Sequence, residues 1–153
     1  MFVADDSIPK KAHTDADALL CTHNDNHLGR CVKGLNFVRL LDVAGSLSVP
    51  IAVAMVEETH AVKVAKTQKM SYKSPLTKNE MLRALLRVAQ QQVAYRYLLA
   101  DSWYASAENM NQVRELGRDS IFALPTYRTV ALSEVERSNG AFQALDTLAF
   151  PDK

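Results

Sequence analysis

The chain has 153 residues and a mass of 17.0 kDa, the size of one ordinary domain. Its 18 Lys and Arg residues balance 17 Asp and Glu residues, so the net charge of +1 excludes a strongly basic or acidic tail protein. A hydrophobic fraction of 48% excludes a disordered chain. No apolar run approaches the roughly 20 residues of a membrane span, and the first residues lack the pattern of a secretory signal. We therefore expect a soluble cytoplasmic domain.

Hydrophobic patterning predicts three strands near the amino terminus, separated by polar segments and turn residues. The first strand is the apolar run 2–4, which ends in Asp5 and Asp6. Residues 7–34 are polar and predict a long hairpin or excursion. Two apolar runs, 35–43 and 49–56, predict the next two strands, separated by a turn at Gly45 and Ser46.

Helices and strands then alternate. Thr77 and Glu80 form a capping-box pattern, and apolar residues at helical spacing follow, which predicts a helix over 77–94. Residues 95–100 predict a strand, Ser106 and Gly117 bracket a second helix, and 120–124 predict another strand. A strand pair is expected in 141–150. Three strands followed by helix–strand alternation describe an α/β fold with a mixed sheet and flanking helices.

The first constellation that can carry chemistry is the pair Asp6 and Asp101, each at the carboxyl end of an apolar strand. Open sheets place ligand sites at these strand ends. Two adjacent carboxylates repel each other unless a cation lies between them, and oxygen ligands suit Mg²⁺. Such ions support phosphoryl transfer. The alternative is that each Asp is a turn or capping residue. Spacing alone does not separate Asp6 from Asp5.

Two further patterns have plain alternatives. Cys21, His23, His27 and Cys31 are potential zinc ligands, but their spacing does not match the usual two ligand pairs, and a polar loop explains them. The second pattern is a stretch without acids between positions 61 and 79, which can neutralise DNA phosphates or simply be a solvated loop. Its candidate DNA-binding residues are Lys63, Lys66, Lys69 and Lys73.

Several motifs together resemble the DDE transposases of bacterial insertion sequences, of the IS-four and IS-seven-oh-one-like type. The most specific are the start Asp5-Asp6-Ser7 and the block Ala100-Asp101-Ser102-Trp103-Tyr104. The similarity continues through other short motifs over nearly the whole chain: Pro9-Lys10, His13-Thr14-Asp15, Cys21-Thr22-His23, Val32-Lys33-Gly34-Leu35-Asn36, Lys78-Asn79-Glu80, Phe122-Ala123-Leu124 and Val130-Ala131-Leu132-Ser133.

The resemblance implies an RNase H-like catalytic core at 1–125, followed by the start of a β-rich insertion at 126–153. It places the first catalytic, metal-binding carboxylate on Asp6 and the second on Asp101, with Mg²⁺ or Mn²⁺ as cofactor. The implied activity is cleavage and transfer of DNA strands at transposon ends during DNA transposition, a form of recombination. The implied partners are DNA and full-length transposase, and the implied location is the bacterial cytoplasm, on the nucleoid.

The chain departs from the family pattern at both ends. No residue matches the family's third carboxylate, a Glu on a late helix, and Glu134 and Glu136 occur too early for it. The region that binds transposon ends would precede Met1. We therefore expect a chain truncated at both ends, with little or no strand transfer on its own and an exposed apolar patch where a helix would cover the sheet.

Two alternatives of other classes stay open. The first is a non-catalytic module that associates with DNA or with a transposase. The second is an unrelated metal-dependent phosphohydrolase that uses Asp6 and Asp101 with a further ligand such as Glu108. Trp103 and Tyr104 are expected to pack against the sheet in either case, and a role facing the substrate is the less favoured interpretation.

Overall fold

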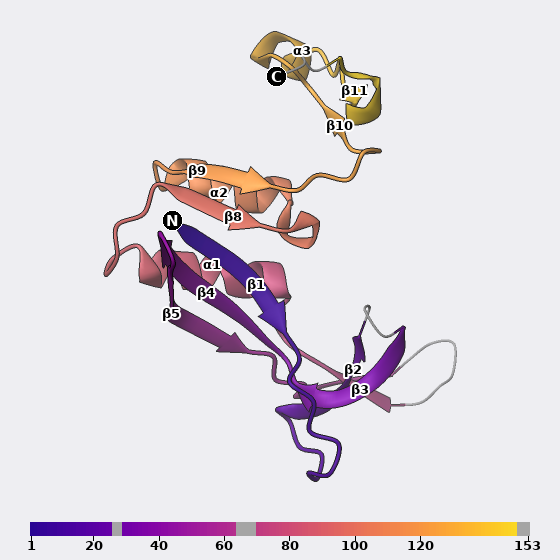
Figure 1. Cartoon of the computed structure of the whole chain (residues 1–153). Helices are drawn as coiled ribbons and strands as arrows, with labels where there is room; N and C mark the ends of the chain where they lie inside the picture. The colour runs from indigo at the N-terminus through magenta and orange to yellow at the C-terminus, as the bar shows by residue number, and fades with distance from the viewer. Residues whose placement is uncertain (26–28, 64–69, 150–153) are drawn as a thin grey trace.

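A five-stranded mixed sheet forms the centre of the protein in the computed structural model, which describes residues 1–25, 29–63 and 70–149 (Figure 1). The strand order is β5-β4-β1-β8-β9. Its strands are β1 (Phe2–Ser7), β4 (Phe37–Ala44), β5 (Leu47–Met55), β8 (Tyr97–Ala100) and β9 (Asp119–Phe122). Strands β5, β4 and β1 are antiparallel neighbours, whereas β1, β8 and β9 run parallel. The predicted α/β fold with a mixed sheet is confirmed.

The two main helices begin at the capping residues that the sequence predicts. Helix α1 (Lys78–Ala89) begins with the predicted capping box, in which Thr77 and Glu80 each accept from the other's backbone N–H. Helix α2 (Ala107–Glu115) begins at the Ser106 cap, after a short 3₁₀ turn, η1 (Ser102–Tyr104). The prediction that α1 extends to residue 94 is wrong. The chain turns after Ala89 because Val93 and Tyr95 return to the core, where Tyr95 stacks on Phe2.

One face of the sheet carries the core. Alternate residues of the central strands are buried beneath the helices, among them Phe2, Val38, Leu40 and Leu98. Figure 1 shows α1 and α2 on this same side of the sheet. The strand residues that alternate with the buried ones face the opposite side of the sheet, where Val53 and Ile121 are 51% and 49% exposed. These two apolar side chains lie on the opposite edge strands, β5 and β9, so they do not by themselves form the expected apolar patch, which stays a prediction.

Two hairpins extend from the carboxyl end of β1 (Figure 1). The first, β2 (Leu20–Asp25) with β3 (Arg30–Leu35), confirms the hairpin expected in 7–34. The second, β6 (His60–Lys63) with β7 (Met70–Lys73), lies in the lysine-rich stretch, where no strand was predicted. Each of its strands has only four residues, and His60–Lys63 does not alternate strictly between apolar and polar residues, so the sequence gives a weak strand signal here.

The last described residues form a small unit of their own. Strand β10 (Thr129–Val130) pairs with β11 (Gln143–Ala144), and the helix α3 (Glu134–Ser138) and a 3₁₀ turn, η2 (Leu145–Thr147), complete it. The prediction of a strand pair within 141–150 is wrong. The strand in this segment, β11, pairs with the earlier strand β10, and the chain then enters the turn η2. No described helix has the length and apolar character required to cross a membrane.

Tyr95 provides a test of the core. Its hydroxyl is buried with no hydrogen-bond partner in the part of the chain that the structure describes. Burial raises the pKa of this hydroxyl, although the nearby Arg118 cation opposes the shift. A Tyr95→Phe variant should therefore be more stable by about 1 kcal/mol in urea denaturation at pH 7, because it removes an unsatisfied buried polar group.

The same variant should respond differently to alkaline pH. Below the ordinary pKa of 10.0, the hydroxyl is protonated in both the folded and the unfolded chain, so it adds no pH dependence. Above that pH the unfolded chain loses the proton first, and the stability of the wild-type protein falls. The fall should be shallower in Tyr95→Phe. The exposed Tyr72→Phe serves as control and should change stability by less than about 0.5 kcal/mol; an unstable Tyr95→Phe would show that the hydroxyl has a partner.

Candidate metal centre

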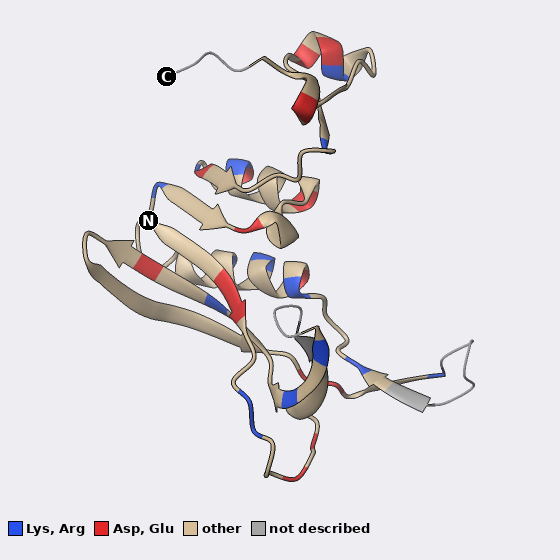
Figure 2. Ribbon diagram, turned by 45° about the vertical axis from the view of Figure 1, so that its right-hand side comes forward, with Lys and Arg blue, Asp and Glu red and all other residues tan. Residues whose placement is uncertain are grey.

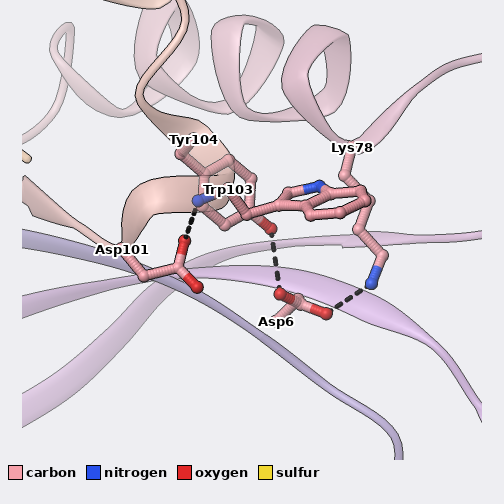
Figure 3. Close-up of polar contacts among 5 residues, drawn as sticks. All are labelled: Asp6, Lys78, Asp101, Trp103 and Tyr104. Carbon is pink, nitrogen blue, oxygen red and sulfur yellow. Dashed lines mark hydrogen bonds and ion pairs between the residues drawn. The ribbon is translucent and has the colours of Figure 1, made fainter. Parts of the chain in front are cut away.

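The pairing of β1 with β8 brings the two predicted aspartates to one edge of the sheet. The strands run parallel, and their last paired residues are Ala4 and Ala100. Asp6 lies two residues beyond that point on β1, and Asp101 follows β8 directly. Because parallel strands end at the same edge, residues distant in sequence meet there. Figure 3 shows both carboxyl groups on the same side of the ribbon, near Tyr104.

Asp6 accepts from two other elements. One carboxylate oxygen, Oδ2, pairs with the Nζ atom of Lys78, the first residue of α1. The other oxygen, Oδ1, accepts a long hydrogen bond of 3.4 Å from the Tyr104 hydroxyl. Asp6 is thus held between the amino end of α1 and the 3₁₀ turn that follows β8 (Figure 3).

Asp101 has a structural role as well. It is the N-cap of η1, and its Oδ1 accepts from the backbone N–H of Trp103 at 3.0 Å. This is the capping role that the sequence left open as an alternative, and it leaves the second oxygen, Oδ2, with no further hydrogen bond among the described residues. Capping orients the carboxylate and does not exclude metal binding, since each carboxylate offers two oxygens.

The residues beside Asp101 divide between core and solvent. Tyr104 is fully buried, as expected. The expectation that Trp103 packs against the sheet is wrong, because its side chain is 63% exposed. The tight 3₁₀ turn explains the difference: successive side chains point in different directions, and the turn directs Tyr104 into the core and Trp103 outward (Figure 3).

Asp5 lies in a different environment from Asp6. It faces Arg39 across the antiparallel pair of β1 and β4, and its Oδ2 contacts the Arg39 guanidinium at 2.7 Å. Successive strand residues point to opposite faces, so Asp5 shares the face without helices and Asp6 shares the face with them. Only Asp6 contacts Lys78 and Tyr104 in the described structure.

The electrostatics of Tyr104 show that negative charge concentrates here. Burial, and then the charges of Asp6, Asp101 and Asp5, raise the pKa of the Tyr104 hydroxyl far above its ordinary value. The hydroxyl therefore remains a hydrogen-bond donor at all ordinary pH values. Three acidic groups act on one phenol, whereas a single ammonium, that of Lys78, pairs with Asp6 in the described site.

A buried amide holds the elements of the site together. Asn109 of α2 is fully buried, and its Nδ2 donates to the Tyr104 carbonyl at 2.8 Å and to Asn79 Oδ1 at 2.6 Å. Its Oδ1 accepts from Arg83 at 2.8 Å. One side chain thus ties α1, α2 and the 3₁₀ turn together. Gln112 adds a second link, since its Nε2 donates to the Arg83 carbonyl at 2.8 Å.

Sequence reasoning did not assign Lys78, Tyr104 or Asn109 to the site. The position of Lys78 could have indicated a role in the site, because a cation in the first turn of a helix interacts unfavourably with the helix dipole and is expected there only if it has a partner. Asn109 had a sequence signal too: it is a polar residue on the helix face that also carries Val113, where the pattern requires apolar residues. Tyr104 had no signal beyond its place three residues after Asp101.

The other predicted residues lie elsewhere. Lys63 and Lys73 are exposed on β6 and β7, whereas Lys66 and Lys69 lie outside the described residues. Of the possible zinc ligands, Cys21 and Cys31 are free cysteines. In the hairpin they pair with Gly34 and Asn24, not with each other. His27 lies outside the described residues.

The donor set can be compared with the needs of a divalent ion. Asp6 and Asp101 offer carboxylate oxygens, and Mg²⁺ typically takes one or two carboxylates and completes its shell with water and phosphate oxygens. A positive group, the Lys78 ammonium, already lies against Asp6. The two residues are therefore of the chemical type that such an ion prefers. Within 1–25, 29–63 and 70–149, no group of three or more His, Cys, Asp or Glu residues could hold a metal.

Comparisons with known proteins identify no relative. No protein-family model matches the chain, and no curated protein or solved structure shows significant similarity to it.

Asn109 gives a direct test of how the site is held. An Asn109→Leu variant should lose about 2–4 kcal/mol of stability in urea denaturation, because Asn79, Arg83 and the Tyr104 carbonyl all lose a buried partner. Asn111→Leu on the exposed side of the same helix is the matched control and should change stability by less than about 0.5 kcal/mol. Equal effects of the two changes would show that the network does not hold the elements together.

Proposed function

We propose that this chain is the carboxylate-bearing part of an RNase H-like DDE transposase, and that Asp6 and Asp101 bind Mg²⁺ or Mn²⁺ for phosphoryl transfer on DNA. The observation that carries this proposal is the parallel pairing of β1 and β8, which brings these two aspartates to one sheet edge. The motif resemblance around Asp6 and Asp101 gives the reaction class.

The topology supports the proposal. In chain order, the strands of the main sheet are β1, β4, β5, β8 and β9, and the first one lies in the middle. Helix α1 connects the antiparallel half to β8, and α2 connects β8 to the parallel strand β9. This is the arrangement of three strands, helix, strand, helix and strand that the RNase H-like interpretation expects.

The chemistry of the site supports it as well. A divalent ion held there would activate an attacking oxygen and stabilise the leaving oxygen of a phosphodiester. Asp6 and Asp101 would supply the protein oxygens. The Tyr104 hydroxyl donates to Asp6, and the backbone N–H of Trp103 orients Asp101. Phosphoryl transfer depends on such positioning and on charge neutralisation more than on covalent chemistry by the protein.

The hairpins supply a surface for the DNA backbone. Lys and Arg residues recur on β3 and on the hairpin β6–β7, as the blue segments of Figure 2 show. Both hairpins leave the sheet at the carboxyl end of β1 (Figure 1), the end that carries Asp6. Cations there, Lys63 and Lys73 among them, would neutralise phosphates without reading sequence.

Metal binding tests the two aspartates. Mn²⁺ binding, followed by loss of the free-ion signal in electron paramagnetic resonance, should weaken at least about tenfold in Asp6→Asn and in Asp101→Asn, because each loses a charged ligand. Binding is the appropriate measurement because two carboxylates alone leave much of the coordination shell of two catalytic ions unfilled.

The controls distinguish the site from general charge effects. Asp119→Asn removes the same charge at the amino end of β9, far along the sheet from the site, and should leave binding unchanged. Asp5→Asn tests the neighbouring carboxylate, which Arg39 already neutralises, and should have a smaller effect than Asp6→Asn. Unaltered Mn²⁺ binding in both Asp6→Asn and Asp101→Asn would overturn the proposed metal centre.

Salt dependence tests the DNA surface. Lys63→Ala and Lys73→Ala should weaken binding to duplex DNA regardless of its sequence. Each should reduce the slope of log affinity against log salt by about one, measured by fluorescence anisotropy. Arg96→Ala, an exposed cation at the amino end of β8, is the matched control. An unchanged slope in the double lysine variant would remove these residues from the DNA interface.

A further inference from the structure

Lys78 makes the ion pair that stands at the centre of the candidate site. Its Nζ contacts Asp6 Oδ2, and the side chains of Lys78 and Asp6 are only 21% and 27% exposed. The neighbouring pair of Arg39 and Asp5 is more open to solvent, at 38% and 49%. Partial burial reduces solvent screening, so the attraction between Lys78 and Asp6 exceeds that of an ordinary surface pair.

The place of Lys78 in its helix is locally unfavourable. It is the first residue of α1, where the exposed backbone N–H groups and the helix dipole favour acids over cations. Glu80, in the same turn, has the favoured sign and belongs to the capping box. The capping box determines where α1 begins, and so it determines where the Lys78 side chain leaves the backbone. The contact with Asp6 therefore explains a charge that the helix itself disfavours.

A positive charge at this position has a direct consequence for metal binding. The carboxylate that would hold a divalent ion already has a cation against one of its two oxygens, and its other oxygen receives only the long Tyr104 contact. An ammonium and a metal ion bound to the same carboxylate repel each other. The ion must therefore either bind weakly or displace Lys78.

We propose that Lys78 is a resident counter-cation, which neutralises Asp6 when no metal is bound and is displaced when a divalent ion binds between Asp6 and Asp101. Lys78 then acts as a positioning residue that lowers metal affinity and keeps the two aspartates from repelling each other in the metal-free protein. On displacement its ammonium, which extends from the amino end of α1, becomes available to a phosphate oxygen. This inference rests on the proposed function, because it requires the metal centre.

Lys78→Met tests the displacement, because it keeps the length of the side chain and removes its charge. Mn²⁺ affinity should rise about tenfold, since the ion no longer competes with the ammonium. The metal-free variant should be less stable than wild type, and saturating Mn²⁺ should raise its melting temperature by more than it raises that of wild type. Trp103, the single Trp of the chain and a neighbour of Asp101, gives an independent fluorescence signal of binding.

Two further variants keep the test decisive. Lys78→Arg retains the charge and the helix, and should bind Mn²⁺ no more tightly than wild type even if Lys78→Met folds poorly. Arg96→Met removes a positive charge at the amino end of β8, remote from Asp101, and should leave affinity unchanged. A comparable rise in affinity in Arg96→Met would mean that overall charge, and not displacement, governs binding.

The outcomes separate this inference from the proposed function. If wild type binds Mn²⁺ and Asp101→Asn does not, but Lys78→Met binds no more tightly than wild type, the counter-cation role is wrong and the metal centre stands. If neither wild type nor Lys78→Met binds Mn²⁺, both are wrong. Tighter binding in Lys78→Met that Asp101→Asn abolishes in the double variant supports both.

Discussion

The parallel pairing of β1 with β8 is the constraint on which the rest of the structure depends. It brings Asp6 and Asp101 to one edge of the sheet, although they are far apart in the chain. Carboxylates gathered at one edge raise the electrostatic energy of the fold unless positive charge offsets them. The ammonium of Lys78 offsets the negative charge of Asp6, and the backbone N–H of Trp103 partly offsets the negative charge of Asp101. Each of the two carboxylates therefore has a positively charged or N–H partner within the described structure.

The surrounding elements hold these groups by specific polar contacts. The capping box fixes the first residue of α1, and with it Lys78. Asn109 links Asn79 and Arg83 of α1 to the carbonyl of Tyr104, so the helix that carries the cation and the turn that follows Asp101 are tied to one buried side chain. A fully satisfied buried amide of this kind favours one arrangement of the elements over others, because any shift leaves several polar groups unpaired. The amide thus determines the positions of Lys78 and Tyr104 relative to Asp6.

Local signals in the sequence predicted most of the elements, and the failures have physical causes. The capping box predicted the start of α1, but not its end, because the return of Tyr95 to stack on Phe2 depends on a residue at the other end of the chain. The hairpin of β6 and β7 was missed because its strands have only four residues each, and its fold is defined by the pairing between them. Trp103 was expected to pack on the sheet, whereas the 3₁₀ turn directs it into solvent. In each case a nonlocal contact or the lack of a core contact decided the outcome.

The sequence by itself determined the α/β class, the order of the main strands and helices, and the two aspartates at strand ends, because these follow from short-range hydrophobic spacing and turn chemistry. It left the choice between Asp5 and Asp6 to the resemblance alone. Only the tertiary structure showed that Arg39 neutralises Asp5, whereas Lys78 and Tyr104 contact Asp6. These partners come from separate elements, and strand register and helix packing alone decide which side chains meet. Charge compensation is a property of positions in space, so no pattern along the chain could have assigned Lys78 to Asp6.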